Sequence, residues 1–534
     1  MRRRTGVIGS VSRRSQYLQF GCHYTMNIVD WIEFGKVSAE RDDLLHHYFF
    51  DNGVLEAVIE SPSSFLVLGR KGAGKTAVFR YLTENPGQYI GSDDVLVALS
   101  FEDYNWNVHA LLTNESKAES MIYKQSWRFV ILVEAVKALA KKLSSEGKKP
   151  PLRLLAAQKL LEKLFDSPVP SIYQIVGRKL LSLSGLKLPS GGFDLEEGSL
   201  DSIKVEGGEI SFDQVEKDSS LRSHLSQNIE NIIAVLEKAL IFDPGWPRVF
   251  VCFDRVDEAW DEDSFDSSRR VIAGLVSAAD AVTTQYKGDL RPIIFLREDI
   301  FDVLSINDAN KLREDCGKLL HWNLESLTKL ALKRANYFGA SAQQAPFADI
   351  DSMFDKPEMR QRSRPSSYII RRTMMRPRDL ISILNRVVST MKERSEDPFA
   401  ESDGQFPKLE CESIYAAEPG YSDWLKQELL DEWKVQRSSI VHLFDAIQNN
   451  GSTNFTSEDL KSQLEKQGHE ISPVEMLAHL RFLFENSIIG FKIGASTQWR
   501  YKCFAPSQGF IESEEYKIHE GLVRALNLKE PRTT

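Results

Sequence analysis

The chain contains five short apolar runs, each followed by a longer segment in which apolar and polar positions have helical spacing. The runs do not alternate as half-exposed strands do, which is typical of strands buried on both faces of a parallel sheet. They span residues 65–68, 95–101, 249–253, 293–296 and 319–322. The pattern predicts an α/β fold in which a parallel sheet carries helices on both faces.

The segments around these runs predict the extent of the first domain. Residues 26–60 read as helices that pack on the sheet. The segment at about 110–220 reads as an insertion, with helices that break at Lys148–Pro151. Over residues 185–213 it becomes rich in glycine and alternates as a short β-insertion does. We therefore expect one core domain over residues 26–325.

Beyond the last apolar run the pattern becomes helical and predicts a lid over residues 326–430. An amphipathic helix starts at Leu324, and the segment around Pro377 places that proline in the first turn of a further helix.

The tail over residues 436–525 predicts a winged-helix-like domain of three helices and a hairpin. Thr456 and Ser472 stand as N-caps of the second and third helices, and Glu475 completes a capping box with Ser472. Residues 490–504 would form the wing hairpin.

Composition adds limits on the class of protein. The chain has 534 residues, is 42% hydrophobic and 27% charged, and has a net charge of −9, so its surface as a whole does not favour nucleic acid. Its five cysteines are scattered without a C-x-x-C pair, which argues against a disulfide framework or a zinc site and fits a reducing cytoplasm. With no run of 18 apolar residues, no membrane span is expected.

The first 25 residues are basic and contain no acidic side chain. Because the composition changes abruptly at Met26, we expect residues 1–25 to be a disordered extension and Met26 to be the initiator.

The first apolar run leads into a phosphate-binding loop. Gly69, Gly74, Lys75 and Thr76 fit the pattern G-x-x-x-x-G-K-[ST]. Glycines let the loop backbone approach a polyphosphate, and the next helix points its N-terminal N–H groups at the same anion. The residues predicted to bind the nucleotide are Gly69, Arg70, Lys71, Gly72, Ala73, Gly74, Lys75, Thr76 and Ala77.

The third apolar run ends at Asp254, which is expected to hold Mg²⁺ together with the Thr76 hydroxyl. Hydrolysis also needs a carboxylate that orients or deprotonates water. Asp257 is the preferred base and Glu258 is the alternative.

Arginines supply the candidate phosphate sensors. Arg297 ends the fourth run, where it is expected to sense the γ-phosphate; the alternative is a surface arginine paired with Glu298 or Asp299. Residues 360–378 hold seven arginines, which read either as a solvated basic face or as a phosphate contact through Arg376 and Arg378.

These motifs, in this order, resemble a family of bacterial P-loop ATPases near the STAND, KAP and AAA+ proteins, and more distantly the origin-recognition initiator ATPases. The resemblance implies an ATPase core with a lid, ATP and Mg²⁺ as cofactors, and a lid arginine of the sensor type at Arg376 or Arg378. Many AAA+ proteins have Glu where this chain has Arg255. The spacing D-x-x-D-E is similar to STAND and KAP proteins and implies slow hydrolysis.

Three functions follow as hypotheses. The first is an ATP-dependent switch that controls a protein partner or self-association, with Arg313 as a candidate arginine finger, in a setting such as bacterial stress or phage defence. The second is a DNA-binding regulator or loader that uses the winged helix. Against it, Arg481 is the only Lys or Arg in the third helix, which also carries two glutamates. The third is a small-molecule kinase, for which no acceptor site is evident.

Overall fold

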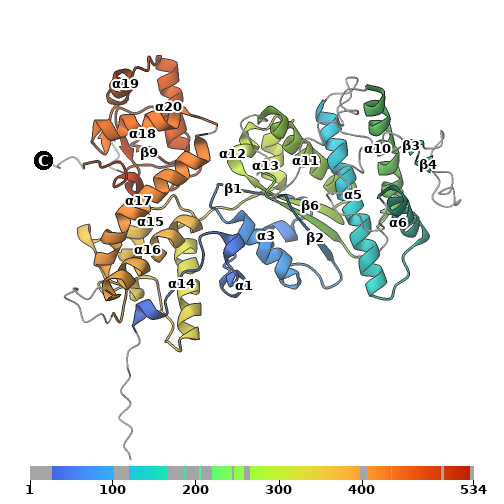
Figure 1. Cartoon of the computed structure of the whole chain (residues 1–534), viewed down its shortest axis with the longest axis horizontal. Coiled ribbons are helices and arrows are strands. Elements are labelled where there is room, and N and C mark those ends of the chain that lie inside the picture. The colour runs from blue at the N-terminus through green and yellow to red at the C-terminus, as the bar shows by residue number, and fades with distance from the viewer. Residues whose placement is uncertain are drawn as a thin grey trace, which may run out of the picture.

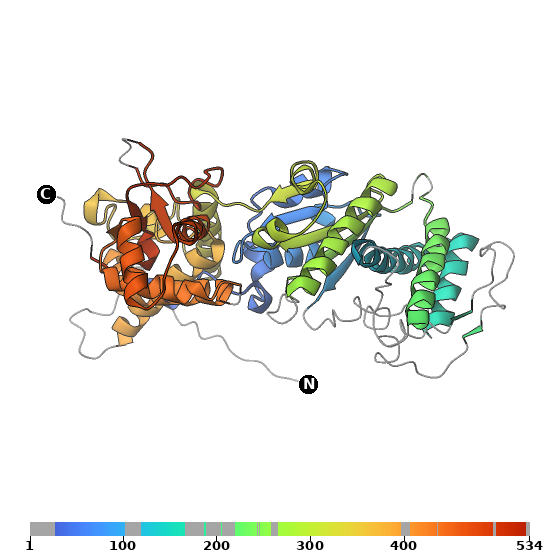
Figure 2. The same cartoon turned by 90° about the horizontal axis from the view of Figure 1, so that it is seen from above.

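The computed structural model describes residues 27–101, 119–165, 186–187, 204–205, 219–242, 244, 246–257, 265–396, 406–434, 436–494 and 498–529. The elements form an elongated arrangement with the sheet in the middle (Figure 1). A lid and a C-terminal unit lie at one end, and a group of insertion helices lies at the other, as the second view also shows (Figure 2). The predicted extension at residues 1–25 falls outside the described residues.

Among the described residues, five strands form one parallel sheet in the order β2-β5-β6-β1-β7. Their bounds are β1 (Leu66–Gly69), β2 (Val95–Ser100), β5 (Val249–Asp254), β6 (Leu290–Arg297) and β7 (Gly317–Leu319). The predicted parallel sheet is thus confirmed. The last strand lies two to three residues earlier than predicted, although Leu320 N still donates to Leu68 O at 2.7 Å. Because β6 lies between β1 and β5, its end falls between the phosphate-binding loop and Asp254.

Alternate residues of each strand point to opposite faces of the sheet and build two hydrophobic cores. On β5, Phe250 and Cys252 join the core that continues into the lid, whereas Val251 and Phe253 join the core on the other face. The first face is covered by α1 (Leu45–Tyr48), α2 (Val54–Glu60) and α3 (Lys75–Glu84). The second face is covered by α5 (Glu119–Ser145), α11 (Phe265–Gln285), α12 (Glu298–Val303) and α13 (Ala309–Cys316).

The insertion helices pack against α5 at the far end from the lid (Figure 1). They are α6 (Leu152–Phe165) and α10 (Ser219–Ala239), and the predicted break at Lys148–Pro151 separates α5 from α6. Strands β3 (Leu186–Lys187) and β4 (Lys204–Val205) pair antiparallel within the segment predicted as a short β-insertion, most of which lies outside the described residues. None of the helices in the described parts of the chain combines the length and apolarity needed to cross a bilayer.

The lid follows β7 and contains four α-helices among the described residues. They are α14 (Leu324–Ser341), α15 (Pro365–Ile370), α16 (Pro377–Glu396) and α17 (Cys411–Trp433). Asn323 forms a capping box with Ser326 at the start of α14, and Pro377 opens α16 as predicted. Helix α17 packs along α16, and its C-terminal end leads to the C-terminal unit.

The C-terminal unit holds α18 (Ser439–Asn450), α19 (Ser457–Lys466) and α20 (Pro473–Glu485), with a small antiparallel sheet β8-β10-β9. The predicted caps are confirmed: Thr456 caps α19, and Ser472 forms a capping box with Glu475 on α20. Within the predicted hairpin over residues 490–504, of which 495–497 lie outside the described residues, an isolated antiparallel bridge joins Phe491 to Arg500. Strand β9 (Ile489–Phe491) also pairs with the later β10 (Tyr516–Ile518), which the sequence pattern did not predict. Strand β8 (Asn454–Phe455) completes the small sheet.

Candidate nucleotide site

The predicted phosphate-binding loop joins the carboxyl end of β1 to the N-terminus of α3. Gly72 and Gly74 have φ angles of 79° and 97°, a left-handed conformation that side chains other than glycine rarely adopt. A Cβ on Gly72 would also lie 3.3 Å from Arg378 Cβ, so the glycine lets the lid approach the loop. Because Gly74 is the N-cap, no side chain occupies the first N–H groups of α3, and they remain available to an anion.

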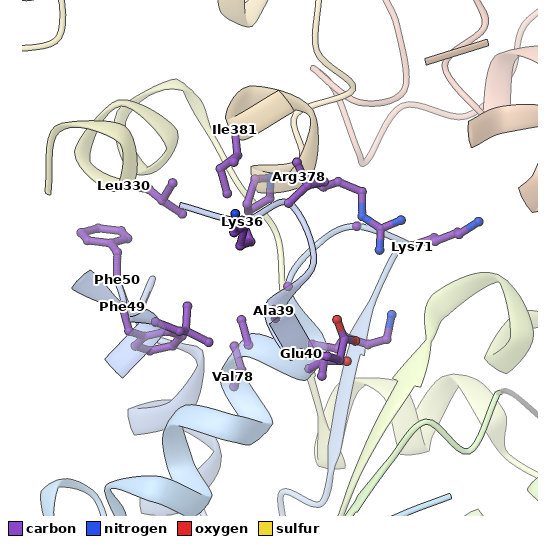
Figure 3. Close-up of a pocket in the computed structure, with 18 of the residues that line it drawn as sticks. Lys36, Ala39, Glu40, Phe49, Phe50, Lys71, Val78, Leu330, Arg378 and Ile381 are labelled. Atoms are coloured by element: carbon purple, nitrogen blue, oxygen red, sulfur yellow. The ribbon is translucent and has the colours of Figure 1, made fainter. Parts of the chain in front are cut away.

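A cavity of about 340 Å³ opens in front of this loop. Its walls come from the loop, from the segment that precedes β1, and from the lid (Figure 3). One end is apolar, with Phe49, Phe50, Leu330 and Ile381, whereas Arg378 projects at the opposite end. The cavity therefore offers an apolar end for a flat ring and a polar end for phosphates.

Lys75 lines the cavity, and its Nζ atom donates to Gly69 O at 3.1 Å and to Arg70 O at 3.3 Å. Burial lowers the pKa of the Lys75 ammonium, while the nearby carboxylates of Asp257 and Asp254 oppose that shift. The charge of Lys75 is thus partly desolvated, which strengthens its attraction to a phosphate.

Thr76 and Asp254 meet as predicted for a magnesium site. The Thr76 hydroxyl lies close enough to Asp254 to lower the pKa of its carboxyl, and the buried Oδ2 atom of Asp254 has no hydrogen-bond partner among the described residues. Burial and repulsion from Asp257 raise the pKa of Asp254 to about 7. No cluster of three His, Cys, Asp or Glu side chains that could hold a metal occurs among the described residues. Mg²⁺ bound beside phosphates needs only one or two protein ligands, so the hydroxyl and the unpartnered carboxylate oxygen fit it.

The candidate bases lie just past β5. Asp257 lines the cavity, whereas Glu258 lies outside the described residues. Between them and the strand, Arg255 has a positive φ of 60° and forms an ion pair with Glu40 at 2.9 Å. Although burial opposes it, the hydrogen bonds from Ser38 and Arg255 lower the pKa of Glu40 to about 2. The ion pair between Arg255 and Glu40 thus connects the end of β5 to the segment that precedes β1.

Arg297 ends β6 directly beside Gly69, its partner in the parallel ladder, and lines the cavity. Arg297 also pairs with Asp299 at 2.7 Å. The alternative pairing with an acidic neighbour is therefore observed in addition to the position of Arg297 at the cavity. Burial opposes its charge, but Asp299, Glu432 and Asp257 raise the pKa of Arg297 above its ordinary value.

The structure separates the two predicted lid arginines. Arg378 lines the cavity and pairs with Glu428 at 2.8 Å. Arg376 is buried outside the cavity wall and pairs with Glu432 at 3.1 Å, although its Cδ atom would meet a Cβ on Gly72 at 3.4 Å. Arg378 is therefore the lid residue placed to reach a phosphate.

Other arginines of the 360–378 segment have partners within the lid. Arg372 pairs with the buried Glu418 at 2.9 Å, and Arg360 stacks over the Tyr415 ring. Among these arginines, Arg372, Arg376 and Arg378 pair with carboxylates, and Arg372 also pairs with Glu520 of the C-terminal unit at 3.2 Å.

The loop also touches the C-terminal unit. The Arg70 guanidinium donates to Glu485 O at the last residue of α20, and Lys502 forms an ion pair with the Glu485 side chain at 3.2 Å. Cations at a helix C-terminus interact favourably with its unpaired carbonyls. The Arg70 side chain thus contacts α20 and does not line the cavity. Of Arg70, the backbone remains as the group predicted to bind a phosphate.

Sequence reasoning missed two groups of residues at the site. The first is the segment before β1, which supplies Lys36, Glu40, Phe49 and Phe50 to the cavity. The second consists of the α17 glutamates that pair with the arginines. The apolar pattern before β1 predicted packing on the sheet without showing which side chains face the cavity, and nothing in the sequence pattern pointed to α17.

Comparisons with known proteins give a partial match. Residues 325–430 match the family described as the FunZ-associated C-terminal helical domain. The chain is 24% identical over 532 residues to the putative transposon gamma-delta 80.3 kDa protein of Escherichia coli K12, covering 93% of this chain and 67% of the relative.

Among solved structures, Cdc6p from Pyrobaculum aerophilum matches at 10% identity and a TM-score of 0.30, covering 91% of this chain and 96% of the other. The Drosophila ORC bound to DNA matches at 11% identity and a TM-score of 0.29, covering 99% and 96%. Superpositions with such low TM-scores do not establish a shared fold. The fold is assigned from the strand order of the sheet and from the geometry of the loop after β1.

Proposed function

We propose that this chain binds Mg²⁺·ATP in the cavity between the sheet, the segment before β1 and the lid, and hydrolyses it slowly. The observation that carries the proposal is the convergence of Lys75, Thr76, Asp254 and Arg297 on one cavity at the uncapped N-terminus of α3. Together these groups supply the cations, the N–H donors and the metal-binding oxygens that a triphosphate needs.

Each residue has a role that its position supports. The N–H groups of the loop and of the first turn of α3 would bind the β- and γ-phosphates, and Lys75 would offset their charge. Thr76 and Asp254 would hold Mg²⁺, which supplies further neutralisation of the phosphate charge when bound. The apolar end beside Phe49 and Ile381 would hold the base.

Asp257 is the proposed group that orients or deprotonates the attacking water, with Glu258 as the alternative. It lines the cavity beside Lys75, within electrostatic reach of Asp254. Slow turnover is in keeping with the absence of a glutamate directly after Asp254, where Arg255 instead pairs with Glu40.

The proposed output is a switch that controls a protein partner or self-association, in a setting such as bacterial stress or phage defence. Arg378 and the α17 glutamates join the nucleotide site to the lid, and Arg70 joins it to α20. An arginine finger at Arg313 is a further part of the self-association version. In the subunit itself this residue pairs with Asp302 and lies 3.8 Å from Glu298, so it would have to exchange these partners.

A DNA-binding regulator or loader is the second candidate, favoured by the relative whose name refers to a transposon. Against it, Lys492 pairs with Glu515 and Lys502 pairs with Glu485, which neutralises two cations of the C-terminal unit. Duplex DNA binding that weakens steeply with salt would favour this candidate, because phosphate contacts release counterions.

The primary experiment measures binding of ATP to the full chain with Mg²⁺ or with EDTA, followed by phosphate release. We expect saturable binding that is tighter with Mg²⁺ and slow release of phosphate. Absence of ATP binding would overturn the proposal, whereas binding without hydrolysis would overturn only its enzymatic part.

A further inference from the structure

Glu432, near the C-terminal end of α17, lies between two arginines of the site. Its carboxylate is 3.1 Å from Arg376 Nη1 and 3.8 Å from Arg297 Nη2. The side chains of all three residues are buried, with 3%, 6% and 12% of Glu432, Arg376 and Arg297 exposed. A buried carboxylate between two arginines is stabilised by both of them. If either ion pair were lost, a charge would remain buried without a partner.

The two carboxylates beside Arg297 differ in origin. Asp299 lies two residues further along the chain, at the start of α12, and therefore moves with Arg297. Glu432 comes from α17, which packs along the lid helix α16. The contact to Asp299 is a hydrogen-bonded pair at 2.7 Å, whereas the contact to Glu432 at 3.8 Å is a longer ion pair. The Glu432 contact is the weaker of the two and is the one that a new anion would displace first.

Arg297 also faces the cavity, where a γ-phosphate would be the new anion. ADP lacks that group and would leave Arg297 with Glu432. A triphosphate would draw Arg297 away and leave Glu432 paired with Arg376 alone. The carboxylate of Glu432 therefore competes with the γ-phosphate and has no such competition with ADP.

We propose that Glu432 is a positioning residue for Arg297 that sets how strongly the site distinguishes ATP from ADP and reports the γ-phosphate to α17. This inference rests on the proposed function. The end of α17 has a direct route to the C-terminal unit, because Trp433 packs edge-on against Phe482 of α20 at 5.3 Å between ring centres. Release of Glu432 from Arg297 thus loosens the part of α17 that touches α20.

The first test compares Glu432→Gln with the full-length wild type for binding of a non-hydrolysable ATP analogue and of ADP, each with Mg²⁺. The amide keeps the shape and an acceptor for Arg376 but removes the competing charge. We expect the ratio of analogue affinity to ADP affinity to rise about three- to tenfold, the usual range for one partly buried ion pair. In an Arg297→Gln background the same substitution should leave the ratio unchanged.

Glu418→Gln is the matched control. Glu418 lies on the same helix, is equally buried and pairs with the lid residue Arg372, but it does not contact Arg297 or the cavity. We expect it to leave the ratio unchanged. A ratio in Glu432→Gln equal to the wild-type ratio, or an equal rise in Glu418→Gln, would overturn the inference while leaving nucleotide binding intact.

A second measurement needs no variant and covers the case in which Glu432→Gln does not fold. Hydrogen exchange of the wild type should increase over residues 428–434 with the ATP analogue relative to ADP. Equal exchange in the two complexes would overturn the inference. If the wild type binds neither nucleotide, the proposed function itself fails, and that outcome is distinct from both of the others.

Discussion

The candidate nucleotide cavity has two halves whose charged groups are balanced in different ways. In the P-loop half, Gly69–Ala77 with Asp254, neither Lys75 nor Asp254 forms a direct ion pair within the described residues: Lys75 donates to backbone carbonyls, and Asp254 Oδ2 accepts no hydrogen bond. The arginine half consists of Arg297 and Arg378, which line the cavity, and each of these already pairs with a carboxylate.

This difference assigns nucleotide binding to the P-loop half and the conformational response to the nucleotide to the arginine half. Anions can enter the P-loop half without breaking any ion pair, so this half should set whether a nucleotide binds at all. Engagement of the arginine half requires that a phosphate replaces Glu428 or Glu432, both on α17. Since α17 connects the lid to the C-terminal unit, that replacement is where a bound nucleotide would change the rest of the molecule.

The largest expected effect is in the P-loop half. Lys75→Ala removes the buried cation and should weaken ATP binding by at least about 30-fold, since hydrogen bonds between charged groups are the strong ones. Lys329→Ala is the control, because Lys329 is exposed on α14, pairs with Glu325 and does not line the cavity, and it should change affinity by less than about threefold. Calorimetric titration measures both. Equal affinities of Lys75→Ala and wild type would show that the P-loop half does not bind the nucleotide.

Asp257→Asn should leave ATP binding in place and slow phosphate release by about 10²–10⁴-fold, the usual contribution of a general base. Single-turnover hydrolysis at saturating ATP separates this effect from binding. If Asp257→Asn hydrolyses ATP at the wild-type rate and Glu258→Gln does not, the base is Glu258.

In the arginine half, Arg378→Gln should weaken binding of an ATP analogue by about three- to tenfold, because one charge-assisted contact to a phosphate is lost. Its partner variant, Glu428→Gln, should act in the opposite direction, since it frees Arg378 for the phosphate. Competition binding against a fluorescent nucleotide measures both. If both variants weaken binding alike, Arg378 acts through lid packing and not through a phosphate contact.

The smallest effect concerns the pH dependence of stability without nucleotide or Mg²⁺. The pKa of Asp254 is about 7 in the folded chain, above its ordinary value, so its contribution to stability is lost as pH rises through 7. Asp254→Asn does not titrate and should gain stability relative to wild type at pH 8 by on the order of 1 kcal/mol. This gain builds up between the ordinary Asp pKa of 3.8 and the folded value of about 7, so it should be clearly smaller at pH 5 than at pH 8. Thermal unfolding at the two pH values tests it, and a difference independent of pH would contradict the buried charge.

The sequence predicted the elements that carry local signals. The apolar runs located all five strands of the parallel sheet, and the loop pattern placed Lys75 at the start of α3. Capping chemistry located the starts of α19 and α20 because a cap is a contact between residues three positions apart.

The features that sequence reasoning missed depend on residues far apart along the chain. The pairing of Arg297 with Glu432 joins β6 to α17 and leaves no periodic pattern. Helix α17 is itself hard to predict, since Pro419 and Gly420 lie inside it and ordinarily interrupt helices. The division between Arg376, which is buried, and Arg378, which lines the cavity, arises from the turn into α16 and could not be read from their spacing.

The most direct test is an experimental structure of the full chain with Mg²⁺ and a non-hydrolysable ATP analogue. The account predicts phosphates at the N-terminus of α3, Mg²⁺ beside Thr76 and Asp254, and the Arg297 guanidinium on the γ-phosphate and withdrawn from Glu432. A triphosphate bound elsewhere, or bound in the cavity with Arg297 still paired to Glu432, would contradict it.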